Sequence, residues 1–131
     1  MTVVDASAVV EMLLRTPAGE KCAARLLAPN EALCAPHVLD IEVAQVLRRF
    51  AGRGELTADR GCEALEDLAD LPLTRYPHGP LHERVWELRH SVSEYDAAYI
   101  ALAEALDAPL VTCDGRIARA HGHRARVQTL E

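Results

Sequence analysis

Three aspartates stand at the edges of strongly apolar segments, where a carboxylate is costly to bury. Asp5 and Asp114 each follow a short apolar run, and Asp96 directly precedes the uncharged run 97–103. A helix that is apolar on all sides is normally buried. An unpaired carboxylate carried into the interior costs several kcal/mol, which is a large part of the stability of a small domain. The three acids therefore require a function or a compensating partner.

The elements that must position these acids alternate along the chain. Strand-like apolar segments are separated by stretches with helical periodicity, which predicts a parallel sheet with helices on both faces. We expect one compact α/β domain over residues 1–131. The expected strands are 2–5, 31–35, 73–76, 109–113 and 126–130, and the expected helices are 7–15, 17–28, 38–51, 57–71, 80–91, 94–106 and 115–121.

In an open parallel sheet, ligands bind at the carboxyl ends of the strands, near the point where the strand order reverses. Asp5 closes the first expected strand, and Asp114 follows the fourth. If these two strands are central and adjacent, the two carboxylates lie within a few ångströms of each other. Asp96, at the start of a buried helix, is expected at the same edge.

Carboxylates that are brought together repel each other unless a cation compensates their charge. Hard oxygen ligands completed by water suit Mg²⁺ or Mn²⁺. Such ions activate water and stabilise charge on a phosphoryl group. The sequence offers no Ser-His-Asp or Cys-His arrangement and no glycine-rich phosphate loop as a competing site.

Taken singly, each acid has a simpler explanation. Asp114, Asp5 or Ser7 could each cap the helix that follows it. Ser93 and Asp96 have the spacing of a capping box. Only the shared position of the three aspartates favours a site over three separate caps. Glu42 is weaker still, because its spacing to Gln45 and Arg49 is equally compatible with a solvated helix face.

The composition of the chain excludes several classes of protein and site. The chain has no apolar run long enough to span a membrane. Its first residues, MTVVDAS, do not form a signal peptide, so a cytoplasmic location is expected. Four cysteines without a CxxC pair are expected to be small core residues rather than disulfide partners or zinc ligands. The close histidine pair His121 and His123 is expected in a solvated turn.

Four segments then point to a family. VVDASAVV, IEVAQVLRR, YDAAYIALAEAL and LVTCDGRIARA follow one another in this order. Together they resemble the PIN-domain ribonucleases, and in particular the VapC-type toxins of bacterial toxin–antitoxin pairs. Each segment is degenerate alone, but the four in order are specific, and the resemblance spans essentially the whole chain.

The resemblance implies a single PIN-like domain with Mg²⁺-dependent endoribonuclease activity, in which metal-activated water hydrolyses RNA phosphodiester bonds. Mn²⁺ is the alternative ion. It also implies a homodimer and a small cognate antitoxin whose extended segment lies against the toxin. The family's catalytic and metal-binding acids fall here on Asp5, Glu42, Asp96 and Asp114. Its supporting hydroxyl positions match Ser7 and Thr112.

The formal net charge of −6 argues against a broad basic face for nucleic acid. Four of these negative charges are accounted for by the acidic quartet, and two divalent ions would neutralise it. RNA would then be held by the metals and by local arginines. The arginines nearest to the acids in sequence are Arg15, Arg49 and Arg116, of which Arg116 is the expected supporting residue.

We also expect a partner surface, because two helices carry more apolar side chains than a small domain hides easily. An antitoxin or a second protomer would cover part of it. The side chains concerned are Val9, Val10, Leu13 and Leu14 in the first helix and Val46, Leu47 and Phe50 in the long helix.

Other metal-dependent phosphotransfer folds fit the sequence less well. A haloacid-dehalogenase-like phosphatase needs a second aspartate where Ser7 stands, and a response-regulator receiver needs a late lysine, whereas Lys21 is the sole lysine. Another metal-dependent phosphohydrolase is therefore disfavoured. The alternative from a different class is a non-catalytic partner-binding module that keeps the acids for structure. Magnesium-dependent cleavage of RNA by the pure protein would separate it from the enzyme.

Overall fold

A five-stranded parallel sheet forms the centre of the protein, whose computed structural model describes residues 1–130. The strand order is β3-β2-β1-β4-β5, so β1 lies in the middle, paired with β2 and β4. From β1 the chain moves outward to β2 and β3, then returns to β4 on the other side of β1. The order therefore reverses between β1 and β4. The strands are β1 (Thr2–Val4), β2 (Leu33–Pro36), β3 (Leu73–Tyr76), β4 (Leu110–Thr112) and β5 (Val127–Thr129).

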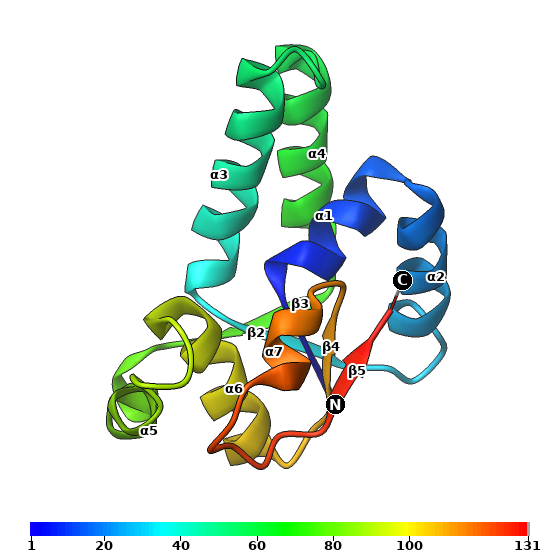
Figure 1. Cartoon of the computed structure of the whole chain (residues 1–131). Coiled ribbons are helices and arrows are strands. Elements are labelled where there is room, and N and C mark those ends of the chain that lie inside the picture. The colour runs from blue at the N-terminus through cyan, green and yellow to red at the C-terminus, as the bar shows by residue number, and fades with distance from the viewer. Residues whose placement is uncertain (131) are drawn as a thin grey trace.

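Helices cover both faces of this sheet (Figure 1). Because parallel crossovers are right-handed, the helices that lead outward to β3 and those that lead back to β5 lie on opposite faces. Helices α3 and α4 run side by side and project away from the sheet (Figure 1). The helices are α1 (Ala6–Leu14), α2 (Pro17–Leu26), α3 (Val38–Gly52), α4 (Ala58–Asp70), α5 (His82–Glu87), α6 (Glu94–Leu106) and α7 (Gly115–Arg119), with a 3₁₀ turn at Gly79–Leu81.

The first two helices pack unusually closely, and Gly19 permits it. The Thr16 side chain caps α2 by accepting a hydrogen bond from the Gly19 N–H at 3.0 Å, and Pro17 occupies the first turn. A Cβ atom on Gly19 would lie 1.9 Å from the carbonyl oxygen of Glu11 in α1. Only a residue without a side chain allows this contact between the two backbones.

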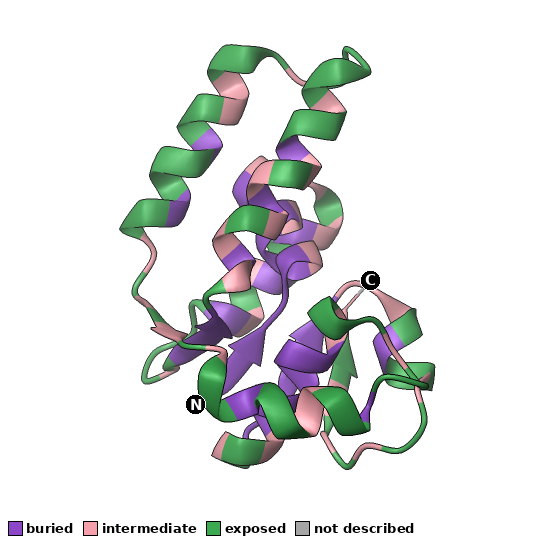
Figure 2. Ribbon diagram, turned by 90° about the vertical axis from the view of Figure 1, so that its left-hand side faces the viewer, coloured by how far each residue is buried: buried purple, intermediate pink, exposed green. Residues whose placement is uncertain are grey.

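The core lies between the sheet and the helices packed on it (Figure 2). Val3, Val4, Leu110 and Val111 of the two central strands are fully buried. The uncharged run 97–103 of α6 is buried at every position, as its composition predicts. The edge strand β5, by contrast, is largely exposed. Within residues 1–130, no helix combines the length and the apolar character needed to cross a membrane.

The expected order of strands and helices is confirmed, and the bounds of most elements differ by one to three residues. The helix expected over 80–91 is wrong in extent. A 3₁₀ turn takes its first residues, and α5 ends at Glu87. There the Leu88 N–H is shared between the carbonyls of Arg84 and Val85, and the Arg89 N–H bonds to the Trp86 carbonyl three residues back. The last helix ends at Arg119 rather than at 121, since Ala120 is extended.

The surplus apolar surface expected on α1 and α3 is not there. Val9, Val10, Leu13 and Leu47 are at most 5% exposed, and the remaining side chains of that set pack partly buried against the core. Helix α1 is enclosed by α2, α3 and α4, so that nearly its whole circumference is covered. The large exposed apolar side chains include Ile41, Trp86 and Tyr95, on α3, α5 and α6.

The cysteines behave as expected in part. Cys22 and Cys34 are buried, and the four thiols are free, but Cys62 is exposed on α4 and is no core residue. The structure also brings together two cysteines far apart in sequence, with the sulfur atoms of Cys22 and Cys113 at 3.3 Å. Burial is the main cause that raises the pKa of Cys113, to about 12, so this thiol stays protonated at neutral pH.

Candidate active site

Asp5 lies at the carboxyl end of the central strand and caps α1. One carboxylate oxygen accepts hydrogen bonds from the Ala8 N–H at 3.1 Å and the Ser7 hydroxyl at 2.7 Å. The other accepts from the Thr112 hydroxyl at 2.5 Å. Asp5 is only 5% exposed. Burial raises its pKa, and the hydrogen bonds from Thr112, Ser7 and Ala8 oppose that rise.

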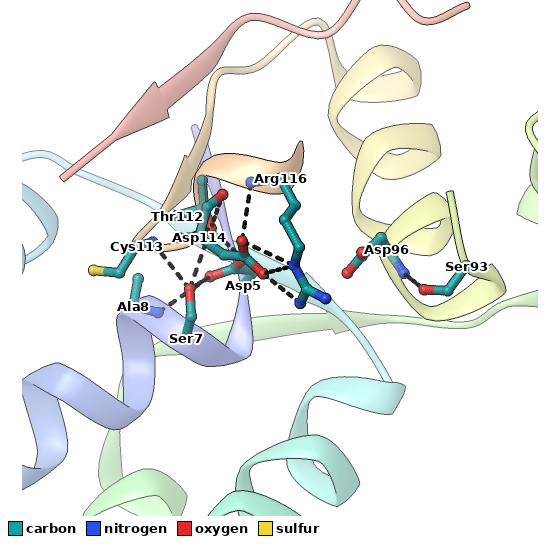
Figure 3. Close-up of polar contacts among 9 residues, drawn as sticks. All are labelled: Asp5, Ser7, Ala8, Ser93, Asp96, Thr112, Cys113, Asp114 and Arg116. Carbon is teal, nitrogen blue, oxygen red and sulfur yellow. Dashed lines mark hydrogen bonds and ion pairs between the residues drawn. The ribbon is translucent and has the colours of Figure 1, made fainter. Parts of the chain in front are cut away.

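Two hydroxyls join the turns that follow β1 and β4 (Figure 3). Ser7 accepts a hydrogen bond from the Cys113 N–H at 2.9 Å, and Thr112 accepts one from the Asp114 N–H at 2.9 Å. The hydroxyl oxygens of Ser7 and Thr112 lie 3.2 Å apart. Both expected supporting hydroxyls therefore connect the Asp5 carboxylate to the backbone of the turn that follows β4.

Asp114 caps α7 and is engaged by an arginine of the same turn. Its carboxylate accepts a hydrogen bond from the Arg116 N–H at 2.9 Å. The Arg116 guanidinium donates to the same carboxylate from Nε at 2.9 Å and from Nη2 at 2.6 Å. These bonds hold the pKa of Asp114 below its ordinary value. Arg116 itself is 75% exposed at its side chain, so the pair lies at the surface of the site.

Asp96 reaches the same place from α6. Its backbone N–H donates to the Ser93 hydroxyl at 3.2 Å, so Ser93 caps the helix. The Asp96 carboxylate points away from that cap, toward Arg116 and Asp114 (Figure 3). Burial raises the pKa of Asp96, the charge of Arg116 lowers it, and the charge of Asp114 raises it. Ser93 thus supplies the cap, and the Asp96 side chain is available to the site.

Glu42 is the fourth acid, carried by α3. It is half-buried rather than solvated, and its Oε1 atom is buried without a hydrogen-bond partner. Burial raises the pKa of Glu42, the nearby Tyr99 hydroxyl lowers it, and the charges of Asp96 and Asp5 raise it. An orphaned carboxylate oxygen is costly to bury and indicates an absent partner.

Tyr99 is a residue of this site that sequence reasoning missed. It lies one turn after Asp96 on α6 and is 1% exposed, and its hydroxyl is also buried without a partner. Burial raises its pKa, and the charges of Glu42, Asp5 and Asp96 contribute to that rise, so the phenol faces the acids. A phenol in an otherwise aliphatic run was the signal in the sequence.

The three arginines differ in their relation to the acids. Arg116 contacts Asp114 directly. Arg49 lines a surface hollow of about 460 Å³ together with Glu42. Arg15 lies at the far end of the nine-residue α1, about 14 Å along the helix from Asp5, beside Arg60 and not beside the acids. Its nearness to Asp5 in sequence therefore does not place Arg15 beside the four acids.

The donor set fits a hard divalent cation. It consists of carboxylate oxygens whose charges raise one another's pKa values, and one of these oxygens has no partner. As the side chains stand, no three histidine, cysteine or acidic groups in residues 1–130 are arranged to hold a metal ion. In this arrangement Arg116 engages Asp114, and the Thr112 hydroxyl engages Asp5.

Comparison with known proteins identifies the family of this chain. Residues 2–122 match the PIN domain family. The chain is 41% identical over 128 residues to ribonuclease VapC12 of Mycobacterium tuberculosis, covering 98% of both chains. It is 49% identical over 117 residues to ribonuclease VapC9 of the same organism, covering 89% of this chain and 88% of the relative.

Among solved structures, the fold matches VapBC2 from Rickettsia felis, bound to a DNA fragment from its promoter, with a TM-score of 0.73. That match covers 99% of this chain and 98% of the other. Because the sequence identity is 14%, it shows similarity of fold alone. The relatives, in contrast, share both sequence and length with this chain. This chain belongs to the PIN-domain family and, within it, to the VapC ribonuclease toxins.

Proposed function

We propose that the protein is a Mg²⁺-dependent endoribonuclease whose ion is held by Asp5, Glu42, Asp96 and Asp114, with Mn²⁺ as an alternative. PIN ribonucleases are metal-dependent. The observation that carries the assignment of residues is the convergence of four carboxylates at the carboxyl edge between β1 and β4. This is the edge where an open parallel sheet binds its ligands.

The chain's own side chains prepare this site in three ways. Thr112 and Ser7 orient the Asp5 carboxylate in its buried position, and their hydrogen bonds oppose the rise in its pKa that burial causes. Arg116 neutralises Asp114 before an ion is present and, being exposed, can turn to bind an RNA phosphate afterwards. When bound, the cation supplies activated water and stabilises charge on the phosphoryl group. Residues 1–131 together would form this one nuclease domain.

The protein would act in the cytoplasm on RNA, as a homodimer that a small cognate antitoxin inhibits. Solved VapBC structures support an antitoxin partner by analogy of fold. Three large exposed apolar side chains, Ile41, Trp86 and Tyr95, support a protein contact on α3, α5 and α6. This surface replaces the one expected from Val9, Val10, Leu13 and Leu14 on α1 and from Val46, Leu47 and Phe50 on α3.

Cleavage of RNA tests the activity. Purified antitoxin-free protein is incubated with total cellular RNA, with Mg²⁺ or with chelator. We expect cleavage only with Mg²⁺ and its loss in Asp5→Asn, because the buried Asp5 is a ligand. Asp107→Asn is the matched control, since Asp107 is exposed at the end of α6 and pairs with Arg126. Equal cleavage by the parent and Asp5→Asn would reveal a contaminant, and cleavage in chelator would refute the metal mechanism.

Thermal melts of Asp96→Asn test the metal site without turnover. The variant keeps the backbone bond to Ser93 and loses only the charge. Because burial penalises that charge, the variant should melt at the parent's temperature or higher in chelator. It should lose most of the stabilisation that Mg²⁺ gives the parent, which depends on metal affinity. A variant that melts lower in chelator but keeps the full Mg²⁺ shift would show that Asp96 only serves the helix start.

A further inference from the structure

Two buried polar atoms beside the acidic cluster have no hydrogen-bond partner, and they belong to neighbouring side chains. They are the Tyr99 hydroxyl and Oε1 of Glu42. A buried hydroxyl without a partner is costly, and phenylalanine would fill the same space at no such cost. The Tyr99 hydroxyl therefore has a use that the metal-free arrangement of side chains does not show.

The groups near the Tyr99 hydroxyl indicate which acceptor it serves. Tyr99 and Asp96 are three residues apart on α6, so both side chains leave the same face of the helix. Glu42 approaches from α3, and the phenol and the Glu42 carboxylate lie close enough to perturb each other. A phenol has one proton to donate. Asp5 is already supplied by three donors, which leaves Glu42 as the acceptor with an open oxygen.

We propose that Tyr99 is a positioning residue, whose hydroxyl donates to one Glu42 oxygen and so directs the other toward the cation. This inference rests on the proposed metal site. Ligating carboxylates are commonly oriented by such outer hydrogen bonds. A hydrogen bond from the Tyr99 hydroxyl to Glu42 would give both unpaired atoms a partner. Tyr99 touches neither ion nor RNA in this role and acts through Glu42.

The experiment measures Mn²⁺ affinity of the whole protein, by electron paramagnetic resonance, for the parent and for Tyr99→Phe. We expect binding about 10- to 100-fold weaker in the variant, the usual effect of losing an outer hydrogen bond to a ligand. In chelator the variant should melt at the parent's temperature or higher, because it loses an unpaired hydroxyl. Its Mg²⁺-induced rise in melting temperature should be smaller than the parent's.

Tyr76→Phe is the matched control. Tyr76 is on β3, and its phenolic hydroxyl lies beside Cys34 of β2, apart from the acids. This control should bind Mn²⁺ as the parent does. If Tyr99→Phe also binds Mn²⁺ within about twofold of the parent, Tyr99 does not position Glu42 and the inference fails while the metal site stands. If the parent itself binds no Mn²⁺, the metal site and the inference fail together.

Discussion

The Thr112 hydroxyl donates a 2.5 Å hydrogen bond to the carboxylate of Asp5, 107 residues away in the chain. The same hydroxyl oxygen accepts a hydrogen bond from the backbone N–H of Asp114. A single side chain thus joins one acid of the site to the backbone of another, across the boundary between β1 and β4. The relative position of the two acids depends on this residue.

We expect Thr112→Val to raise the pKa of Asp5 further. Burial already raises this pKa, and the Thr112 bond is the main opposing cause, so its loss removes that opposition. The variant should also lose about 1–3 kcal/mol in unfolding free energy, because the partly buried N–H of Asp114 loses its acceptor. Titration of the Asp5 carboxyl by NMR measures the first effect. Thr112→Ser keeps the hydroxyl and should leave the Asp5 pKa near that of the parent; an unchanged pKa in Thr112→Val would contradict the prediction.

Glu42→Gln should change how the stability of the metal-free protein depends on pH. Burial raises the Glu42 pKa above its ordinary 4.5 in the folded state, so the folded protein binds a proton more readily than the unfolded chain. Stability is therefore lost as the pH rises from 4.5 through the raised pKa, by about 1.4 kcal/mol for each unit of pKa. Glu42→Gln has no carboxyl group to ionise at this position, so its unfolding free energy should not fall in this way.

Urea denaturation in chelator between pH 4 and pH 7.5 measures the difference. Glu42→Gln should exceed the parent in stability at neutral pH, and the gap should close toward pH 4. With Mg²⁺ the order should reverse, because the parent binds the ion more tightly. Glu55→Gln, at an exposed position, should show neither effect. A variant less stable than the parent at neutral pH in chelator would show that the Glu42 charge is compensated by another group.

Arg116→Ala should tighten Mn²⁺ binding, because the guanidinium no longer competes for the Asp114 carboxylate. An exposed ion pair is worth about 0–1 kcal/mol, so the gain should be at most about fivefold. Calorimetric titration measures it. Arg126→Ala, which breaks the exposed pair with Asp107, should leave Mn²⁺ affinity unchanged. Weaker binding in Arg116→Ala would mean that the arginine supports the ion rather than replacing it.

Gly19→Ala should cost about 1–3 kcal/mol in unfolding free energy, as overpacked sites commonly do. The added Cβ would collide with the backbone of α1, which a rotamer change cannot relieve. Gly52→Ala at the end of α3 is the control, because no atom lies within 4 Å of its Cβ position. It should be neutral or slightly stabilising. Chemical denaturation distinguishes the two, and equal stabilities would show that α2 shifts freely away from α1.

Local patterns in the sequence predict the strands and helices well because burial and period are local properties. They also place Asp5 and Asp114 at strand ends, and the adjacency of β1 and β4 then brings the two acids to one edge. The placement of Glu42 could not be predicted in this way. Its α3 neighbours Gln45 and Arg49 are exposed, whereas Glu42 is half-buried beside Tyr99 and Asp96 of the distant α6. Only the resemblance to the PIN-domain ribonucleases assigned Glu42 to the site.

Other features depend on packing between distant segments, which no local pattern encodes. Helix α1 reads as an apolar helix with surface to spare, but three other helices enclose it. Arg15 is close to Asp5 in sequence, yet the helix between them carries it away. Tyr99 reads as one more core residue until the orphaned oxygen of Glu42 is placed beside it.

The position of β4 in the sheet has a consequence for the order in which the protein is made. During synthesis, a chain that has reached residue 108 already contains Asp5, Glu42 and Asp96. It still lacks β4, the strand that pairs with β1 and precedes Asp114. Thr112 and Asp114 are also missing at that stage, so the Asp5 carboxylate has no partner across the sheet. A growing chain on the ribosome, surrounded by RNA, therefore has no assembled nuclease site until this late strand has been made and inserted.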